Sequence, residues 1–389
     1  MASSAELSIA LVAGEPSGDL LAARLLSGLR ELRPQARLHG IGGERMAEYG
    51  FRSDYPMEKL AVRGLFEVLR HYREIKGIQN ALCRQLLQER PAAFIGVDAP
   101  DFNLGLETRL KDAGIPTMHF ISPSIWAWRG GRIKKIARAV SHMLVIFPFE
   151  EAIYRSAGIP ATYVGHPLAE VIPMQADVAA ARAALGLAGS APVVAILPGS
   201  RMSELRFNSV AFVGAARLLA AREPGIRFVA PMAGQAQRRY FESLLAGAGV
   251  SGVPLQIIDG QSHAAIAAAD AVLVASGTAT LEVALMKKPM VIAYKMMAAS
   301  WQLMRHMGYQ PWVGLPNILA REFVVPELLQ HAATPEAISQ ALWEQLEDDA
   351  GRKRLTQRFT EMHHALLRDT ARLSAQAVLD MIARRQERL

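Results

Sequence analysis

A short run of small and hydroxyl residues, Ser276-Gly277-Thr278, separates two segments of different character. Residues 271–275 are apolar and β-prone and predict a buried strand, whereas the helix formers from Ala279 onward predict a helix. A tight turn between a strand and a helix leaves several backbone N–H groups unpaired and pointing one way, which suits a phosphate. Glu282 lies one helical turn further on, where its carboxylate could accept hydrogen bonds from ribose hydroxyls. Taken alone, the stretch fits a nucleotide site and an ordinary capped turn equally well.

Arg201 offers a second set of phosphate donors. It ends the segment 197–201 (Leu-Pro-Gly-Ser-Arg), which follows an apolar strand in the same half of the chain, and its guanidinium presents donors in a fixed fork. A single arginine after a strand is usually a solvated surface residue. The turn at Ser276 in the same half favours phosphate binding as the role of Arg201. We therefore expect a helix N-terminus and Arg201 to hold a nucleotide diphosphate. Because the sequence has no metal-ligand cluster, we expect these groups rather than a metal to meet the charge of a departing diphosphate.

Asp98 is the candidate general base. It directly follows the apolar segment 93–97, and ligands of open α/β sheets bind at the carboxyl ends of the strands. Transfer of a sugar to a hydroxyl requires a group that takes the hydroxyl proton, and a carboxylate suits that role. Asp101 is the competing candidate, but its place after Pro100 favours capping of the next helix. His166 lies in a Gly-His-Pro turn, where a structural role is more common than contact with substrate.

Alternating strands and helices must position these residues. The first half of the chain predicts strands at 8–13, 37–41, 93–97, 117–121, 143–147 and 161–164. The second half predicts strands at 193–197, 228–231, 255–258, 271–275 and 290–294. This pattern is typical of parallel sheets covered by helices on both faces, so we expect an α/β protein with two doubly wound Rossmann-like domains and a cleft between them. We place the domains at 1–168 and 169–365, joined by a linker around Pro173, and expect 366–389 to pack back on the first domain, in the same chain or swapped within a dimer.

Composition narrows the class of protein. The 389 residues include 51% hydrophobic and 20% charged residues, as expected of a packed chain with two cores. Cys83 is the single cysteine, which excludes an internal disulfide. We expect no leader peptide, and no run of about 18 apolar residues is present. The net charge of +7 favours an anionic partner. No nucleic-acid-binding motif is present, and Arg45 stands where a G-x-G-x-x-G dinucleotide motif needs its third glycine.

A long helical pattern over 60–87 carries more apolar surface than one buried stripe needs. Leu65, Phe66 and Leu69 alternate with basic residues near its start. One interpretation is a core helix of an α/β domain. The other is an apolar, basic-edged surface that enters an anionic membrane or takes acyl chains.

Six segments together resemble motifs of the bacterial lipid-A-disaccharide synthase family, inverting glycosyltransferases of the two-Rossmann (GT-B) type. The segments are 14–19, 96–103, 122–129, 197–201, 275–282 and 315–320, in family order. One departure is 206–210 (Arg-Phe-Asn-Ser-Val), where the family has an apolar, often proline-containing segment; it concerns local helix packing only.

The resemblance implies that UDP-2,3-diacylglucosamine donates its sugar to 2,3-diacylglucosamine 1-phosphate (lipid X). The products would be a β-1,6-linked tetraacyl disaccharide 1-phosphate and UDP, formed with inversion, without a metal and without a cofactor. The resemblance also implies a cytoplasmic enzyme of lipid A and lipopolysaccharide biosynthesis. It would be bound peripherally to the inner membrane of a Gram-negative bacterium and form a homodimer through its C-terminal segments.

The resemblance also implies roles for individual residues. Asp98 would be the base, and Arg201 and Asn317 essential polar groups. The expected UDP contacts are Arg201, Ser276, Gly277, Thr278, Ala279, Thr280 and Glu282. The expected acceptor, acyl-chain or membrane contacts are Ser17, Trp126, Arg129, Leu65, Phe66 and Leu69.

Two other functions remain open from the residues alone. A UDP-sugar 2-epimerase, or a GT-B transferase with a soluble acceptor, would share the nucleotide site of the second half but would need no apolar surface in the first. A basic protein that binds membranes or nucleic acid without catalysis is the alternative from a different class.

Overall fold

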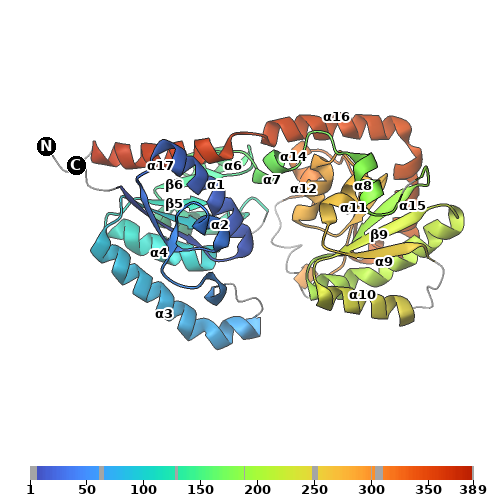
Figure 1. The fold of residues 1–389 in the computed structure, drawn as a ribbon, viewed down its shortest axis with the longest axis horizontal. Helices are drawn as coiled ribbons and strands as arrows, with labels where there is room; N and C mark the ends of the chain where they lie inside the picture. Colours follow the sequence, from blue (N-terminus) through green and yellow to red (C-terminus); the bar gives the residue numbers. More distant parts are fainter. Residues whose placement is uncertain are drawn as a thin grey trace. The chain divides into compact units, whose positions relative to one another are not determined.

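The computed structural model describes residues 7–60, 65–127, 130–187, 189–247, 253–298, 300–302 and 310–387; for residues 65–72 it gives the helical backbone but not the side chains. The chain divides into two compact units. The first consists of Met1–Glu170 together with Leu366–Leu389, and the second is Val171–Ala365. Each unit is an α/β structure with its own parallel sheet (Figure 1). This confirms the predicted fold class of two Rossmann-like units.

The first unit contains a seven-stranded parallel sheet of order β3-β2-β1-β4-β5-β6-β7. Its strands are β1 (Ser8–Ala13), β2 (Arg37–Ile41), β3 (Arg52–Ser53), β4 (Ala93–Val97), β5 (Thr117–Phe120), β6 (His142–Val145) and β7 (Ala161–Tyr163). Because β1 and β4 are neighbours in the middle of the sheet, the loops that follow them leave the same edge side by side.

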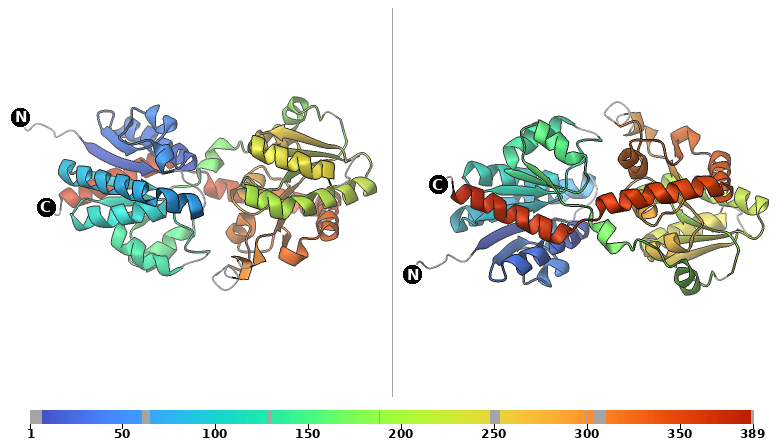
Figure 2. Two further views of the ribbon diagram at one scale, coloured as in Figure 1. Left: turned by 90° about the horizontal axis from the view of Figure 1, so that it is seen from below. Right: turned by 90° about the horizontal axis from the view of Figure 1, so that it is seen from above.

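Helices cover both faces of this sheet. They are α1 (Pro16–Leu32), α2 (Glu44–Ala47), α3 (Leu65–Glu89), α4 (Pro100–Asp112), α5 (Ile133–Ala139), α6 (Glu150–Ser156), α7 (Pro167–Val171) and α17 (Thr370–Gln386). Helices α3 and α4 pack on one face, and α17 lies against α1 on the other (Figure 2). A Cβ atom on Gly28 of α1 would lie 2.2 Å from the carbonyl oxygen of Ala371, so this close approach of α17 requires glycine.

The second unit contains a six-stranded parallel sheet of order β10-β9-β8-β11-β12-β13. Its strands are β8 (Val193–Leu197), β9 (Arg227–Met232), β10 (Leu255–Asp259), β11 (Ala271–Val274), β12 (Met290–Tyr294) and β13 (Glu327–Leu329). Its helices are α8 (Val178–Ala184), α9 (Met202–Arg222), α10 (Gln235–Gly247), α11 (Ser262–Ala268), α12 (Thr278–Leu285), α14 (Leu315–Ala320), α15 (Pro335–Glu347) and α16 (Asp349–Leu366). Helices α9, α10 and α15 pack on one face, with α11 and α12 on the other (Figure 1).

Central strands of both sheets are continuous apolar runs because both of their faces are covered. Every residue of β4, β8 and β11 is buried, as expected of strands in the middle of a parallel sheet. Cys83, on α3, is buried in the core of the first unit and is a packing residue there. Within the described ranges, no helix is both long enough and apolar enough to cross a bilayer.

The structure differs from the sequence prediction at the edges of the sheets and after Leu168. The edge strands β3 and β13 were not predicted, because two exposed residues and three half-buried ones carry no recognisable period. The stretch predicted as a linker contains the helix α8, whose N-cap Asp177 accepts a hydrogen bond from the Ala180 N–H at 2.9 Å. Arg182 ties this helix to the second unit through an ion pair with Asp270 at 2.7 Å.

Candidate active site

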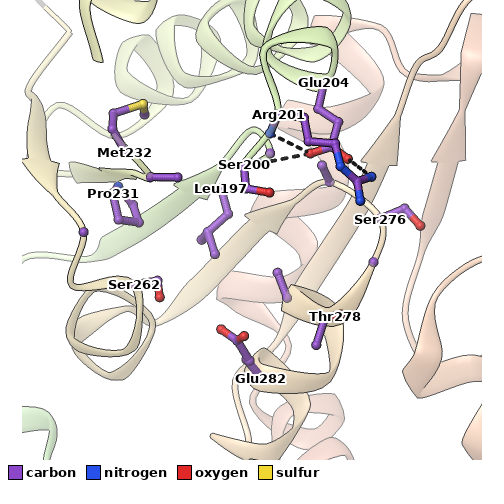
Figure 3. Close-up of a pocket in the computed structure, with 16 residues that line it drawn as sticks. Leu197, Ser200, Arg201, Glu204, Pro231, Met232, Ser262, Ser276, Thr278 and Glu282 are labelled. Carbon is purple, nitrogen blue, oxygen red and sulfur yellow. Dashed lines mark hydrogen bonds and ion pairs between the residues drawn. The ribbon is translucent and has the colours of Figure 1, made fainter. Parts of the chain in front are cut away.

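A cavity of about 370 Å³ lies at the carboxyl edge of the second sheet (Figure 3). Strands β8 and β11 are neighbours, with Leu197 paired to Val274, so the connections that follow them open into the same space. The lining residues are Leu197, 199–201, Glu204, 231–233, Gly260, Ser262, 275–279 and Glu282. Arg201 and the Ser276 turn, which are far apart in the sequence, therefore share one cavity.

The turn between β11 and α12 has the open geometry expected of a phosphate-binding turn. Gly277 is the N-cap of α12 and has a φ of +111°, a left-handed conformation that favours glycine, and no atom lies within 4 Å of the position where its Cβ would be. Ser276, Gly277, Thr278 and Ala279 all line the cavity. The approach to the N-terminal N–H groups of α12 is thus free of side chains at Gly277.

Thr280, predicted to contact UDP, is not among the lining residues. Its side chain is fully buried, its hydroxyl donates to the carbonyl oxygen of Gly277 at 2.8 Å, and its Oγ1 accepts from the Leu315 N–H at 3.3 Å. The side chain therefore fixes the shape of the turn from below instead of facing the cavity.

Arg201 stands at the start of α9 with its backbone fixed and its guanidinium exposed. The Glu204 carboxylate accepts the backbone N–H groups of Ser200 at 3.0 Å and Arg201 at 3.2 Å, which satisfies two donors at the helix start. Gly199 has a φ of +123°, and a Cβ there would lie 2.4 Å from the Cβ of Glu204, so this turn requires glycine. The Arg201 side chain is 72% exposed and lies 3.4 Å from Glu204 Oε1, which leaves it able to turn toward a ligand.

Glu282 lines the cavity from the first turns of α12. Its Oε2 lies 3.5 Å from Nε2 of His263, a residue of α11. The hydrogen bond to Glu282 raises the pKa of His263, against the effect of partial burial. The imidazole therefore holds the Glu282 carboxylate in place while one side of that carboxylate faces the cavity.

Asn317, predicted to be an essential polar group, is fully buried beneath the edge of the second sheet. Its Nδ2 donates to the carbonyl oxygen of Val325 at 2.9 Å and to Glu327 Oε1 at 2.8 Å. Its Oδ1 accepts the N–H groups of Val324 at 2.8 Å and Val325 at 3.0 Å. The amide therefore fastens the segment that leads into β13, and it is not among the residues that line the cavity.

Replacing Asn317 with alanine should lower the free energy of unfolding by about 2–4 kcal/mol, because two backbone N–H groups and a carboxylate lose their buried partners. Chemical denaturation of the full chain measures this change. Asn80→Ala, which removes one exposed hydrogen bond to Arg109, should change the free energy of unfolding little. Unchanged stability in Asn317→Ala, combined with lost activity, would instead assign the side chain directly to the reaction.

Asp98 follows β4 at the carboxyl edge of the first sheet. It has a φ of +51°, and Ala99 after it has a φ of +43°, so two consecutive residues with side chains are left-handed. Burial raises the pKa of the Asp98 carboxyl and the charge of Glu15 adds to this, while the Ala99 N–H and the charge of His119 oppose it. A partly buried carboxylate whose pKa is raised is a stronger base than a solvated one, which suits the proposed role.

Ser17 lies at the same edge as Asp98. It is exposed in the first turn of α1, which follows β1. A Cβ on Gly14 would lie 3.3 Å from the Cβ of Ala99, so the loops after β1 and β4 touch. The first sheet therefore brings the start of α1, which carries Ser17, close to the loop that carries Asp98.

Asp101 does not cap the next helix, contrary to the sequence-based expectation. The N-cap of α4 is Ala99, and no side chain accepts a hydrogen bond there. Asp101 instead pairs with Arg132 at 2.9 Å, and its own side chain is 85% exposed. The Asp101 carboxylate is therefore occupied by a surface ion pair.

Trp126, predicted to contact the acceptor, is packed in an aromatic cluster beyond β5. It lies edge-on to Phe149 with ring centroids 5.2 Å apart, and its Nε1 donates to Glu150 Oε1 at 2.9 Å. Burial raises the pKa of Glu150 to about 7. His166 packs against Phe147 in this cluster, and burial lowers the pKa of His166 to about 4, so its ring is neutral at pH 7.

Four predicted contacts lie outside the described part of the structure. Arg129 is not described, and the side chains of Leu65, Phe66 and Leu69 on α3 are not described. Among the residues whose placement is given, no group of three or more His, Cys, Asp or Glu side chains could hold a metal ion.

Several site residues were missed by sequence reasoning. Met232 at the end of β9 and Ser262 after β10 line the cavity because the sheet runs in the order β10-β9-β8, and this strand order cannot be read from the sequence. Glu204 carried a usable signal, since its position three residues after Arg201 is the spacing of a capping box.

Solved structures define the class of protein. UDP-GlcNAc 2-epimerase from Neisseria meningitidis, in a structure bound to UDP-GlcNAc, superposes with a TM-score of 0.62 at 12% identity, covering 97% of this chain and 99% of that one. MurG from Acinetobacter baumannii superposes with a TM-score of 0.53 at 16% identity, covering 98% and 99%. At these identities the likeness concerns the fold alone. The fold is that of GT-B glycosyltransferases and related epimerases.

Relatives of high identity define the family. The sequence model of the family described as lipid-A-disaccharide synthetase matches residues 9–380. The lipid-A-disaccharide synthases of Paraburkholderia phymatum and Paraburkholderia xenovorans are 57% and 56% identical to this chain over 383 residues, covering 98% of each chain. The chain belongs to the lipid-A-disaccharide synthetase family, and it is a glycosyltransferase of lipid A biosynthesis.

Proposed function

We propose that this glycosyltransferase condenses UDP-2,3-diacylglucosamine with 2,3-diacylglucosamine 1-phosphate (lipid X). The products are the β-1,6-linked tetraacyl disaccharide 1-phosphate and UDP. The observation that carries the proposal is the single cavity that contains the Ser276–Ala279 turn, Arg201 and Glu282. The relatives of high identity are lipid-A-disaccharide synthases, which supports a lipid A disaccharide as the product.

In this mechanism the acceptor hydroxyl attacks the anomeric carbon of the donor sugar as the bond from that carbon to the UDP oxygen breaks. Attack from the face opposite UDP inverts the configuration. Asp98 takes the proton of the attacking hydroxyl, and the charge that develops on UDP is met by Arg201 and by the N–H groups at the start of α12. No step requires a metal, because a guanidinium and a helix N-terminus already supply the positive potential.

We assign the UDP-sugar to residues 169–365 and the acceptor and the membrane to residues 1–168. Glu282 accepts hydrogen bonds from the ribose, and Ser17, Trp126 and Arg129 belong to the acceptor side. The enzyme acts in the cytoplasm, bound peripherally to the anionic inner membrane, and forms a homodimer through its C-terminal segments. Contacts such as that of α17 with α1 would form within one chain or between two swapped ones.

The proposal is tested by incubating the full-length protein with both lipid substrates. We expect disaccharide and UDP in a 1:1 ratio, with activity largely unchanged in EDTA. A UDP-sugar 2-epimerase would consume UDP-GlcNAc without an acceptor, and a transferase with a soluble acceptor would ignore lipid X. A complete loss of activity in EDTA that Mg²⁺ reverses would overturn the metal-free mechanism.

The start of α3 gives a separate prediction about the membrane. Replacing Leu65, Phe66 and Leu69 with serine should release the protein from anionic vesicles while the fold stays intact, because burial of apolar side chains in the interface stabilises such binding. Vesicle co-sedimentation and thermal melting measure the two effects. Leu82→Ser, in the fully buried part of the same helix, should unfold the first unit instead. Unfolding of the triple variant would show that its three side chains belong to the core.

A further inference from the structure

A fully buried polar set lies behind the Asp98 turn and has no role in the proposed mechanism. It consists of Asn103 and Glu107 on α4 and His119 on β5, each 0% exposed. Nδ1 of His119 lies 2.7 Å from Oε1 of Glu107. Stability alone would favour apolar side chains at such positions, because polar groups are costly to remove from water.

Asn103 ties the end of β4 to the end of β1. Its Nδ2 donates to the carbonyl oxygen of Asp98 at 2.8 Å and lies 3.4 Å from the carbonyl oxygens of Val97 and Val12. Its backbone N–H donates to the carbonyl oxygen of Ala99 at 3.0 Å. One side chain thus holds the two central strands together at the point where the chain turns toward α4.

The turn held in this way is conformationally costly. Asp98 and Ala99 both have left-handed φ angles, and a residue with a Cβ adopts this region only where its surroundings enforce it. The Asp98 N–H donates to the carbonyl oxygen of Phe120 at 3.0 Å, which fixes the residue on its other side. Without Asn103, the carbonyl oxygen of Asp98 would lose the hydrogen bond that it accepts from Nδ2. Asp98 and Ala99 could then relax out of the left-handed region.

Glu107 and His119 fix the floor beneath Asn103. A Cβ on Gly96 would lie 2.2 Å from Glu107 Oε1 and 2.8 Å from the Cβ of Asn103, so both side chains pack directly over the backbone of β4. Gly96 and His119 are paired in register on β4 and β5. The contact between Glu107 and His119 therefore anchors α4 against the sheet one helical turn beyond Asn103.

We propose that Asn103 is a positioning residue for the reaction, because it holds the left-handed turn from which Asp98 presents its carboxylate. The Glu107–His119 pair keeps α4, and with it Asn103, in register with β4. This inference rests on the proposed role of Asp98 as the base. It assigns Asn103 an effect on the chemical step and none on the nucleotide site.

The test is a double-mutant cycle in the full-length enzyme. Asn103→Leu keeps the volume of the side chain but removes its donors, so we expect the fold to be retained. The kcat should fall by roughly 10- to 100-fold through misplacement of the base, with the KM for the UDP-sugar and the Kd for UDP unchanged. In an Asp98→Ala background, Asn103→Leu should cause no further loss of kcat, since both changes remove the same interaction.

Two further variants make the test specific to the turn. Ala99→Gly, added to Asn103→Leu, should restore part of kcat, because glycine adopts the left-handed region without steric cost. Thr108→Ala, which removes a hydrogen bond to the carbonyl oxygen of Leu104 on the same helix, should leave kcat near that of the wild type. If Asn103→Leu is unstable, the rescue of kcat by Ala99→Gly is measured at low temperature and decides the same question.

Three outcomes would overturn the proposal. If Asn103→Leu lowered kcat equally in the wild-type and the Asp98→Ala backgrounds, Asn103 would not act through Asp98. A loss of UDP affinity that follows the loss of thermal stability would show a structural role only. Wild-type turnover by Asp98→Ala would remove the base assignment itself, which is a failure of the proposed function that the single variant already reveals.

Discussion

Replacing Asp98 with alanine is expected to lower kcat by roughly 10²- to 10⁴-fold, while the affinity for UDP stays nearly unchanged. The loss follows because the attacking hydroxyl no longer has a group to take its proton. UDP affinity is preserved because Arg201, the Ser276–Ala279 turn and Glu282 line the cavity of the second unit, and Asp98 belongs to the first unit. Steady-state kinetics measures kcat, and calorimetry measures the Kd for UDP.

Asp101→Ala is the matched control for this experiment. Its carboxylate is exposed and paired with Arg132, so its removal should change kcat by no more than a few-fold. If Asp101→Ala proved the inactive variant, or if Asp98→Ala mainly weakened UDP binding, the base assignment would be wrong.

The pH dependence of the reaction follows from the surroundings of Asp98. Burial and the charge of Glu15 raise the pKa of its carboxyl, and the Ala99 N–H and His119 only partly offset this. A base must be ionised to act, so kcat/KM should fall as the pH drops through this raised pKa. The acid limb of the profile should therefore lie above the ordinary range of an aspartate. An acid limb near the value of a solvated aspartate would indicate that a different carboxylate is titrating.

The buried strands could be predicted from the sequence almost without error. The predicted limits of 8–13, 37–41, 93–97, 193–197 and 290–294 are those of the structure. Central strands of a parallel sheet are apolar throughout and are bounded by glycine, proline or polar residues, so their ends are visible. The edge strands β3 and β13 lack that signal because they are short and partly exposed. Their place is decided by the neighbouring strand, which is a tertiary effect.

The candidate site was predictable where one short segment carries the whole geometry. Ser276-Gly277-Thr278 directly joins the end of a strand to the start of a helix, so its placement in the cavity follows from local rules. Thr280 and Asn317 show the limit of such reasoning. Both belong to motifs of the family, yet their side chains are buried and hold loops in place. A motif identifies a position, whereas the packing around it decides whether its side chain faces a ligand or the core.

Arg201→Ala should lower kcat/KM by roughly 10²- to 10³-fold, or about 2.7–4 kcal/mol, because it removes a fork of charged donors from the place where negative charge grows during bond breaking. The affinity for UDP should fall as well, whereas the affinity for uridine, which has no phosphate, should change little. This difference separates loss of a phosphate contact from general damage to the cavity. Calorimetry with the two ligands and steady-state kinetics provide the measurements.

Two arginine variants complete the argument about charge and geometry. Arg201→Lys keeps the charge but loses the planar fork, so its activity should lie between that of the wild type and that of Arg201→Ala. Arg206→Ala removes the same charge from an exposed residue of α9 that does not line the cavity. This variant should leave activity unchanged. If Arg206→Ala matched Arg201→Ala, the effect would come from the long-range field of α9. If Arg201→Ala kept wild-type affinity for UDP, the diphosphate could not be bound in this cavity. We expect neither of these two results. Glu204 fixes the backbone of Arg201, and Arg201 and the open Gly277 turn line the same cavity of about 370 Å³.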